Sequence, residues 1–326
     1  MAIPQVKLHP EGPTVSQLIF GTWRLANSNG FEADSSLATP ESVLERIEAC
    51  LELGITTFDL ADIYGGRRRW PVIGYAYEEL FGKALALNPE LRKKMQLITK
   101  TGIKIPNEMW SEKVYVNHYD TSYDYVRSQV ERSLRLLGTD HLDVVLIHRL
   151  DYLLDADETA KVMTDLRNEG KVKYWGVSNH TYTQVELLQS RLDFPLVTNQ
   201  IEFSPSCLTG MDDGTLDQCQ RLRMSPMCWS PLGGGSLFKK DVSNDPKTER
   251  LQKALRKVAN DFGNDTTLDQ AAYSFLLRHP SKPVIVLGTN KIDRLKGAAA
   301  IYDKKMNLDR QQFYLIWEAS KGHSVP

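Results

Sequence analysis

Four side chains that can share a proton occur at the ends of short apolar runs in the first half of the chain. They are Asp59 and Tyr64 in TTFDLADIYG, Lys100 at the end of MQLITK, and His148 at the end of LDVVLIH. A phenol has a pKa of about 10 and donates its proton poorly at neutral pH, but a neighbouring ammonium favours the phenolate. We therefore predict that Lys100 lowers the pKa of Tyr64 and that Asp59 holds the lysine as its ion-pair partner. His148 can orient a substrate carbonyl by a hydrogen bond, which completes a tuned general acid.

These side chains need a scaffold that gathers strand ends, and the chain offers eight strand candidates. Short β-branched or apolar runs alternate with helical patterns along the sequence. The runs cover residues 18–23, 56–61, 95–100, 142–148, 173–179, 195–203, 226–230 and 283–288. Eight such units favour an α/β fold closed into a (β/α)8 TIM barrel, which we expect as a single domain over residues 1–326. An N-terminal β-hairpin and an extra C-terminal helix are also expected.

Helix signals separate the strand candidates. Thr39 is placed to cap a helix with Pro40 at its first position and Gly54 as its stop. Residues 125–137 have one apolar face and are followed by Gly138. Capping boxes are predicted at 181–184 and 267–270. The alternative fold, an open doubly wound sheet, usually carries G-x-G-x-x-G after its first strand, and neither this motif nor a P-loop occurs in the chain.

Most of the residues at the C-terminal ends of the predicted strands are polar or ionisable. Besides the four residues above, they are Ser178, Asn179, Gln200, Trp229, Ser230, Gly288 and Thr289. In a (β/α)8 barrel the active site lies at the C-terminal ends of the strands. The sequence therefore predicts one site at that end.

Composition excludes several classes of partner. The chain has 40 basic and 41 acidic residues, a net charge of −1, which argues against nucleic acid or an anionic membrane. Its four cysteines form no C-x-x-C pair, which argues against a zinc or redox motif and suits a reducing cytosol. No apolar run reaches about 18 residues, and the N-terminus has no secretory pattern. We expect a cytoplasmic protein with a small-molecule substrate and no metal; the oligomeric state is not readable from the sequence.

The motifs GITTFDLADIYG, LITKTG, LDVVLIHR, WGVSNH and WSPLGGGSL occur in this order. They resemble the aldo-keto reductase superfamily, most closely the branch of YdhF-type oxidoreductases, and the resemblance covers nearly the whole chain. It implies an NADPH-dependent enzyme that reduces aldehydes and ketones to alcohols by hydride transfer. In this resemblance the Asp-Tyr-Lys-His tetrad is formed by Asp59, Tyr64, Lys100 and His148, with Tyr64 as the proton donor.

The resemblance also implies the residues that bind the nicotinamide cofactor. Ser178, Asn179 and Gln200 match positions that hold the carboxamide, and Trp229 matches the aromatic residue on which the nicotinamide ring stacks. Ser230 and Leu232 match positions along the pyrophosphate, while Gly288, Thr289, Asn290, Lys291 and Arg294 match the segment that binds the 2′-phosphate. Gly21, Thr22 and Trp23 at the end of the first strand, and Asp59 itself, complete the set.

The segment GTNKIDRLKGAA supports a phosphate site on its own residues. It is typical of a loop that enters a helix, with Asn290 placed as the cap. Backbone amides at a helix N-terminus, together with Lys291 and Arg294, suit a phosphate dianion. The family often has a lysine at Gly288 and a glutamate–asparagine pair at 297–298, both absent here. The predicted phosphate site favours NADPH as the cofactor. The absence of these family residues leaves NADH as the alternative.

Two other function classes compete with a reductase. A non-catalytic or redox-sensing nicotinamide-nucleotide-binding protein on the same fold, as in potassium-channel β subunits, would not need the intact tetrad. A metal hydrolase on a barrel often uses a His-x-His pair on an early strand, and none occurs here.

Substrate choice depends on loops, and two of them depart from the family pattern. The segment 65–78 is longer than the usual turn after the tyrosine and carries Arg67, Arg68 and Arg69. We hypothesise that these arginines favour anionic carbonyl substrates; the competing interpretation is a solvated loop whose arginines pair with Glu78 and Glu79. The chain ends soon after its last helix candidate, which predicts an open, permissive pocket.

Overall fold

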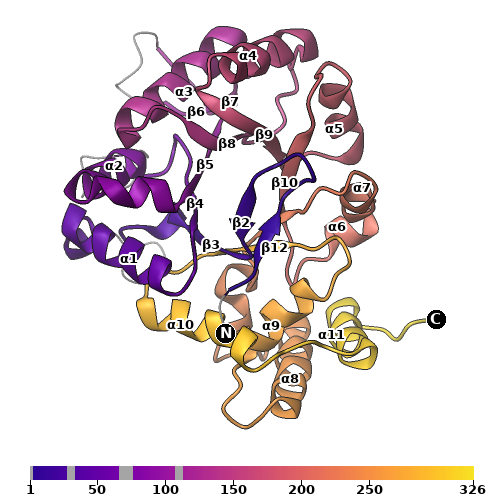
Figure 1. The fold of residues 1–326 in the computed structure, drawn as a ribbon. Coiled ribbons are helices and arrows are strands. Elements are labelled where there is room, and N and C mark those ends of the chain that lie inside the picture. Colours follow the sequence, from indigo (N-terminus) through magenta and orange to yellow (C-terminus); the bar gives the residue numbers. More distant parts are fainter. Residues whose placement is uncertain (1–2, 28–33, 66–75, 107–112) are drawn as a thin grey trace.

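The structure, a computed structural model, describes residues 3–27, 34–65, 76–106 and 113–326. Its centre is a closed barrel of eight parallel strands (Figure 1). In ring order the strands are β10 (Leu196–Glu202), β11 (Met227–Trp229), β12 (Val284–Leu287), β3 (Leu18–Gly21), β4 (Thr57–Asp59), β5 (Gln96–Thr101), β8 (Leu142–Ile147) and β9 (Val172–Ser178). The predicted (β/α)8 barrel is confirmed.

Helices surround this barrel, and the predicted caps define where several of them begin and end. They are α1 (Pro40–Glu52), α2 (Tyr77–Leu87), α3 (Tyr123–Leu137), α4 (Ala156–Asn168), α5 (Tyr182–Gln189), α6 (Thr209–Asp212), α7 (Thr215–Arg221), α8 (Pro246–Asp261), α9 (Leu268–Leu277), α10 (Ile292–Asp303) and α11 (Arg310–Lys321). Thr39 accepts a hydrogen bond from the amide of Ser42, and Gly138 ends α3 at φ 64°. Both predicted capping boxes, at Thr181 and Thr267, are confirmed.

The predicted N-terminal hairpin closes the bottom of the barrel. β1 (Gln5–Lys7) pairs with β2 (Thr14–Ser16), and the amide of Ser16 donates to Thr57 Oγ1 at the start of β4 (3.0 Å). Leu8 and Val15 are fully buried among the interior side chains of the barrel. The hairpin therefore acts as a hydrophobic plug at the N-terminal ends of the strands, on the near face in Figure 1.

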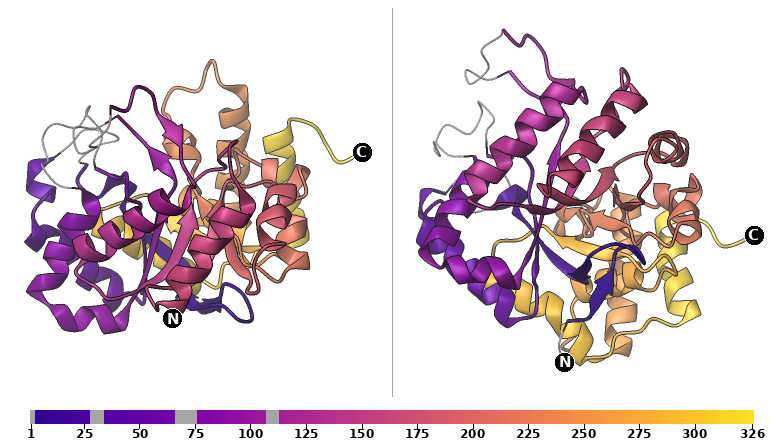
Figure 2. Two further views of the ribbon diagram at one scale, coloured as in Figure 1. Left: turned by 90° about the horizontal axis from the view of Figure 1, so that it is seen from above. Right: turned by 45° about the horizontal axis from the view of Figure 1, so that its top comes forward.

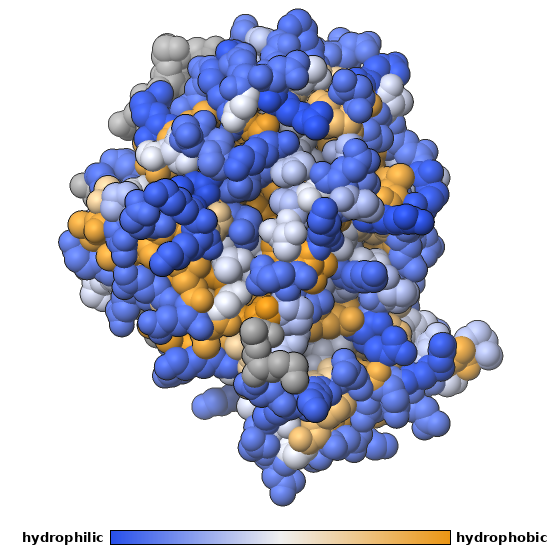
Figure 3. Space-filling view, viewed as in Figure 1, coloured by the Kyte–Doolittle hydropathy of each residue, from blue (hydrophilic) through white to orange (hydrophobic). Residues whose placement is uncertain are grey.

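The expected C-terminal helix is α11, which packs beside α8 and outside the ring of barrel helices (Figure 2). Phe313 of α11 stacks on Phe275 of α9 with ring centroids 4.6 Å apart, and Arg250 Nε of α8 donates to the carbonyl of Ala319 (3.2 Å). No helix in the described part of the chain is long and apolar enough to cross a membrane. Polar residues dominate the N-terminal face, with hydrophobic residues showing between the helices (Figure 3).

Candidate active site

The tetrad residues of the sequence prediction gather at the C-terminal ends of three adjacent strands. Asp59 is the last residue of β4, Lys100 lies near the end of β5, and His148 follows β8 directly. Tyr64 lies in the turn after β4, where its amide donates to the carbonyl of Ala61 (3.1 Å). Parallel strands bring their carboxyl ends to one edge, so residues far apart in sequence become neighbours here.

Lys100 is the centre of this cluster. Its Nζ lies 2.8 and 2.7 Å from the two carboxylate oxygens of Asp59, 2.7 Å from the carbonyl of Leu60 and 3.3 Å from Tyr64 Oη. The side chains of Lys100 and Asp59 are only 0% and 4% exposed. A buried ammonium with this many acceptors has its desolvation offset by short, charge-assisted bonds.

Burial outweighs the lysine in setting the acidity of Tyr64. Removal from water raises the pKa of Tyr64 above its ordinary value; Lys100 opposes this shift and Asp59 adds to it. The predicted effect of Lys100, which lowers the pKa of Tyr64, is therefore present, but the larger effect of burial exceeds it. Burial alone would lower the pKa of Lys100, but the charge of Asp59 raises it, so the lysine stays charged.

Aromatic rings hold the phenol in place. The ring of Tyr64 meets Trp23 edge-to-face with centroids 4.9 Å apart, and meets His148 edge-to-face at 6.0 Å. The backbone amide of His148 donates to the carbonyl of Thr101 (2.7 Å), which ties the histidine to the end of β5. These contacts leave the phenol little rotational freedom.

Two further residues anchor Asp59, and sequence reasoning did not foresee these bonds. Gln200 donates its Nε2 to Asp59 Oδ1 (2.8 Å), and Thr22 donates its hydroxyl to the Asp59 carbonyl (3.0 Å). The neighbouring Gly21 is required by packing, because a Cβ there would lie 2.8 Å from the carbonyl oxygen of Leu287 on β12. The cofactor-site residues predicted on β3 and β10 are thus brought next to the tetrad.

Ser178, Asn179 and Trp229 form one hydrogen-bonded group beside Gln200. Trp229 Nε1 donates to Asn179 Oδ1 (3.0 Å), Asn179 Nδ2 donates to Ser178 Oγ (2.7 Å), and Ser178 Oγ donates to the Gln200 carbonyl (3.0 Å). Asn179 adopts a left-handed backbone with φ 57°. The guanidinium of Arg149 lies over the Trp229 ring, 5.7 Å from its centroid. The structure therefore brings these predicted carboxamide and stacking residues together.

The segment after β11 continues this edge. Ser230 also has a positive φ, 49°, and its carbonyl accepts a bond from the amide of Gly233 (2.8 Å). Leu232 is half-buried and packs on the main core cluster. The turn leads into a short 3-10 helix, Gly233–Phe238, so the two predicted pyrophosphate residues lie on one tight turn.

The predicted phosphate segment enters α10, but its cap differs from the expectation. Lys291, not Asn290, occupies the position before α10, and no side chain caps the helix. Thr289 Oγ1 instead accepts from the amide of Lys291 (3.2 Å). Lys291 and Arg294 are exposed, as is Gly288, and neither cation has an ion-pair partner among the described residues. Uncapped helix amides beside two unpaired cations fit a phosphate group.

A pair of buried carboxyl groups behind the tetrad was not foreseen. Glu78 is fully buried; its carboxylate accepts from Thr99 Oγ1 (2.6 Å) and Ser133 Oγ (3.0 Å) and lies 3.9 Å from Arg132 Nη1. Burial raises the pKa of Glu78, and burial together with the charge of Glu78 raises the pKa of Asp62. The available signal in the sequence was the position of these acids, because Asp62 and Glu78 lie within the largely apolar runs FDLADIYG and YEELFG.

The arginines Arg67, Arg68 and Arg69 lie outside the described residues, so the hypothesis about them stays a prediction. Of the two acids proposed as their partners, Glu78 is buried as above, and Glu79 pairs with Lys83 (2.8 Å). Among the described residues, no group of three His, Cys, Asp or Glu side chains is arranged to hold a metal ion.

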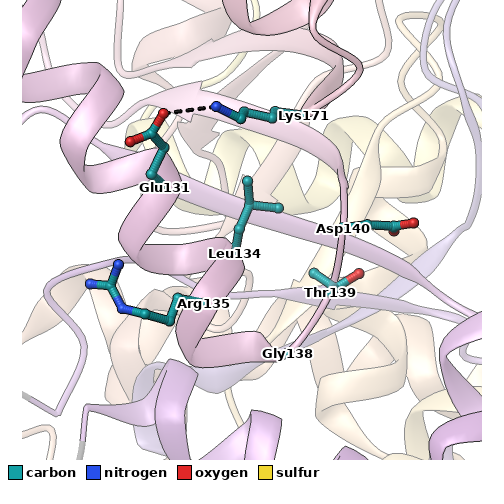
Figure 4. A pocket seen from close by; sticks show the side chains of 7 residues that line it. All are labelled: Glu131, Leu134, Arg135, Gly138, Thr139, Asp140 and Lys171. Carbon is teal, nitrogen blue, oxygen red and sulfur yellow. Dashed lines mark hydrogen bonds and ion pairs between the residues drawn. The ribbon is translucent and has the colours of Figure 1, made fainter.

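A surface hollow lies beside the C-terminal end of α3 (Figure 4). It is lined by Glu131, Leu134, Arg135, Gly138, Thr139, Asp140 and Lys171. These residues come from the C-terminal half of α3, the loop that precedes β8, and the residue that precedes β9, Lys171, which pairs with Glu131 (2.8 Å). Because it lies at the N-terminal ends of the strands, this hollow is not part of the tetrad site.

Comparison with known proteins gives the chain its relatives. A sequence model of the Aldo/keto reductase family matches residues 17–321. The chain is 41% identical to "Oxidoreductase YdhF" of Escherichia coli (strain K12), covering 99% of this chain and all of that protein. It is 42% identical to a "6-dehydroglucose reductase" of Agrobacterium fabrum, covering 95% of this chain and 96% of the relative.

The fold agrees with solved structures. The holo form of aldo-keto reductase AKR11C1 from Bacillus halodurans superposes with a TM-score of 0.76 at 22% identity, covering 99% of this chain and 98% of that one. The family match over residues 17–321 and the near full-length relatives lead to one conclusion: this chain belongs to the Aldo/keto reductase family.

Proposed function

We propose that this protein is an NADPH-dependent reductase that converts aldehydes or ketones to alcohols, with Tyr64 as the proton donor. The observation that carries the proposal is the buried chain of contacts from Asp59 through Lys100 to the Tyr64 hydroxyl. A binding protein gains nothing from burying a lysine–aspartate pair beside a phenol, because such pairs are costly to desolvate. A proton donor gains a stabilised conjugate base.

Each tetrad side chain has one task in this reaction. The bound reduced nicotinamide supplies the hydride to the carbonyl carbon. Tyr64 gives its proton to the carbonyl oxygen, and the charge of Lys100 stabilises the phenolate that remains. Asp59 keeps Lys100 charged and in place. His148, beside the Tyr64 ring, orients the carbonyl by a hydrogen bond.

The residues present fit a nicotinamide dinucleotide phosphate. Lys291 and Arg294 at the uncapped start of α10 would hold the 2′-phosphate. The hydrogen-bonded group of Ser178, Asn179 and Gln200 would hold the carboxamide, and Trp229 would support the ring. NADH lacks the 2′-phosphate, so it would use the same site without the contacts to Lys291 and Arg294.

Tyr64→Phe tests the proposal, because it removes the hydroxyl and keeps the ring packing. We expect carbonyl reduction to fall on the order of 10²–10⁴-fold, with cofactor binding by fluorescence titration nearly unchanged. Tyr314→Phe on the partly exposed face of α11 is the matched control and keeps full activity. Retention of more than about half of the wild-type rate by Tyr64→Phe, when chemistry limits turnover, would refute the assignment.

The substrate panel follows from the site and from the relatives. Aldehydes, ketones and quinones test the general chemistry, and oxidised sugars enter because a relative is named for reduction of 6-dehydroglucose. Tight NADPH binding without turnover of any carbonyl would instead favour the non-catalytic or redox-sensing nucleotide-binding protein.

A further inference from the structure

The side chain of Asn290 is committed to backbone partners away from α10. Its Nδ2 donates to the carbonyl of Arg24 (3.0 Å) and to the carbonyl of Asn27 (2.7 Å). The opposite orientation of the amide would place Oδ1 against two carbonyl oxygens, so the donor assignment follows from chemistry. Both amide hydrogens are used, and none is left for a phosphate.

Asn27 is the meeting point of three segments that are distant in sequence. It is 5% exposed, and its carbonyl receives the bond from Asn290 on the β12–α10 loop. Its Oδ1 accepts a bond from the hydroxyl of Tyr77, the first residue of α2 (3.0 Å). The backbone amide of Asn27 donates to the carbonyl of Arg24 within the turn after β3 (3.2 Å). We call Asn27, Tyr77 and Asn290 the Asn27 clamp.

The clamp reaches Tyr64 from two sides. The amide of Tyr77 donates to the carbonyl of Tyr64 (3.0 Å), and the Tyr77 ring lies so close to Gly65 that a Cβ there would be 2.6 Å from it. On the other side Trp23, which precedes Arg24 in the turn held by Asn290, packs edge-to-face on the Tyr64 ring. Tyr64 is thus held between two elements that Asn290 and Asn27 join.

We propose that Asn290 is a positioning residue for the reaction: through Asn27 and Tyr77 it sets the place of the Tyr64 phenol relative to the cofactor segment 288–294. The proposal rests on the function proposed above. It separates the role of Asn290 from that of Lys291 and Arg294, whose exposed cations would hold the 2′-phosphate. It also explains why Asn290, in the segment predicted to bind a phosphate, donates both of its amide hydrogens to the turn after β3.

The test uses Asn290→Ala, which removes both donors. We expect kcat to fall by roughly tenfold, from two lost hydrogen bonds, and the Kd values of NADPH and NADH to rise by a common factor. Arg294→Ala, by contrast, is expected to weaken NADPH binding far more than NADH binding. The matched control is Asn307→Ala in the exposed turn after α10, which leaves kcat and both Kd values unchanged.

Tyr77→Phe provides a second variant that is independent of the α10 loop. It removes only the hydroxyl that binds Asn27 and keeps the buried ring. We expect kcat to fall in this variant as well, and the double variant with Asn290→Ala to lose less than the product of the single effects, because both act through Asn27. Tm values of all variants report folding separately from kcat.

Three outcomes would overturn the proposal. A loss confined to NADPH in Asn290→Ala would make Asn290 a reader of the 2′-phosphate. A lowered Tm with unchanged kcat and Kd would make the clamp a structural brace only. Strictly multiplicative effects on kcat in the double variant would show that Asn290 and Tyr77 act independently and not through Asn27. Failure of the proposed function is recognised separately, because either Tyr64→Phe would stay active or the wild-type protein would turn over no carbonyl.

Discussion

Gln200 and Asp59 are joined across the mouth of the barrel, with Nε2 of the amide 2.8 Å from Oδ1 of the carboxylate. Their strands, β10 and β4, are separated in the ring by β11, β12 and β3, so the bond spans the opening instead of linking neighbours. Lys100 holds the same carboxylate from β5. Asp59 is therefore fixed from two directions, and its lysine partner cannot rotate away from Tyr64.

Loss of the bond across the mouth should lower activity without unfolding the barrel. For Gln200→Leu we expect kcat/KM to fall about 10- to 150-fold, because a bond to a charged group contributes about 1.5–3 kcal/mol. Steady-state kinetics and a thermal melt measure the two effects. Gln220→Leu on the exposed face of α7 is the control. An unchanged kcat/KM for Gln200→Leu would show that Lys100 alone holds Asp59.

Removal of one member of the buried ion pair should cost more stability than removal of both. Lys100→Met leaves the Asp59 carboxylate buried without its cation, and we expect the free energy of unfolding to drop by about 3–5 kcal/mol. Asp59→Leu combined with Lys100→Met should regain much of that loss while staying inactive. Urea unfolding monitored by circular dichroism measures both. A double variant less stable than Lys100→Met would contradict this account.

Arg294→Ala should weaken NADPH far more than NADH. A charge-assisted contact of about 1.5–3 kcal/mol corresponds to roughly 10- to 150-fold in affinity, and NADH lacks the group contacted. Fluorescence titration with both cofactors measures the ratio. Lys296→Ala removes the same charge from an exposed position on the same helix and serves as the control. Equal losses for the two cofactors would remove Arg294 from the 2′-phosphate site.

Glu78 should make the protein less stable as pH rises. Burial raises its pKa above the ordinary value of 4.5, so above that pH the unfolded chain has lost a proton that the folded protein keeps. The free energy of unfolding therefore falls as pH rises from about 4.5 towards the folded-state pKa. Glu78→Gln removes this titration and can still bind Thr99 and Ser133, while Asp62 and Arg132 remain beside it.

Urea unfolding at several pH values tests the Glu78 prediction. We expect the stability of Glu78→Gln, relative to wild type, to increase between about pH 4.5 and 7. Glu79→Gln, at the neighbouring position paired with Lys83, should show no such trend. A constant difference between Glu78→Gln and wild type across this range would mean that Glu78 is already ionised in the folded protein.

The strand ends were predictable because they depend on local pattern. The strand candidates that end near Asp59, end on Lys100 and carry Gln200 predicted both the barrel and the edge for the site, and the structure confirms the barrel. The caps at Thr39 and Gly138 were equally local, since each depends on a few adjacent residues. Strand limits shifted by a few residues: the run 56–61 yields a strand of only Thr57–Asp59.

The missed features all depend on three-dimensional neighbours. The bond from Gln200 to Asp59 joins residues 141 positions apart, and no periodicity reports it. Asn290 was expected to cap α10 because asparagine is a good cap, but two carbonyl groups on the turn after β3 compete for its amide. The acidity of Tyr64 depends on how much water burial removes, which the residue types near it do not reveal.

The hairpin that plugs the N-terminal end of the barrel has a practical consequence for attaching this protein to surfaces. Residues 5–16 lie on the face opposite the tetrad (Figure 2). A surface that holds the protein by this face would leave the tetrad end of the barrel directed towards solution. Deleting the hairpin would expose to water the interior barrel residues that pack against Leu8 and Val15. An immobilised form of the protein should therefore keep the hairpin intact.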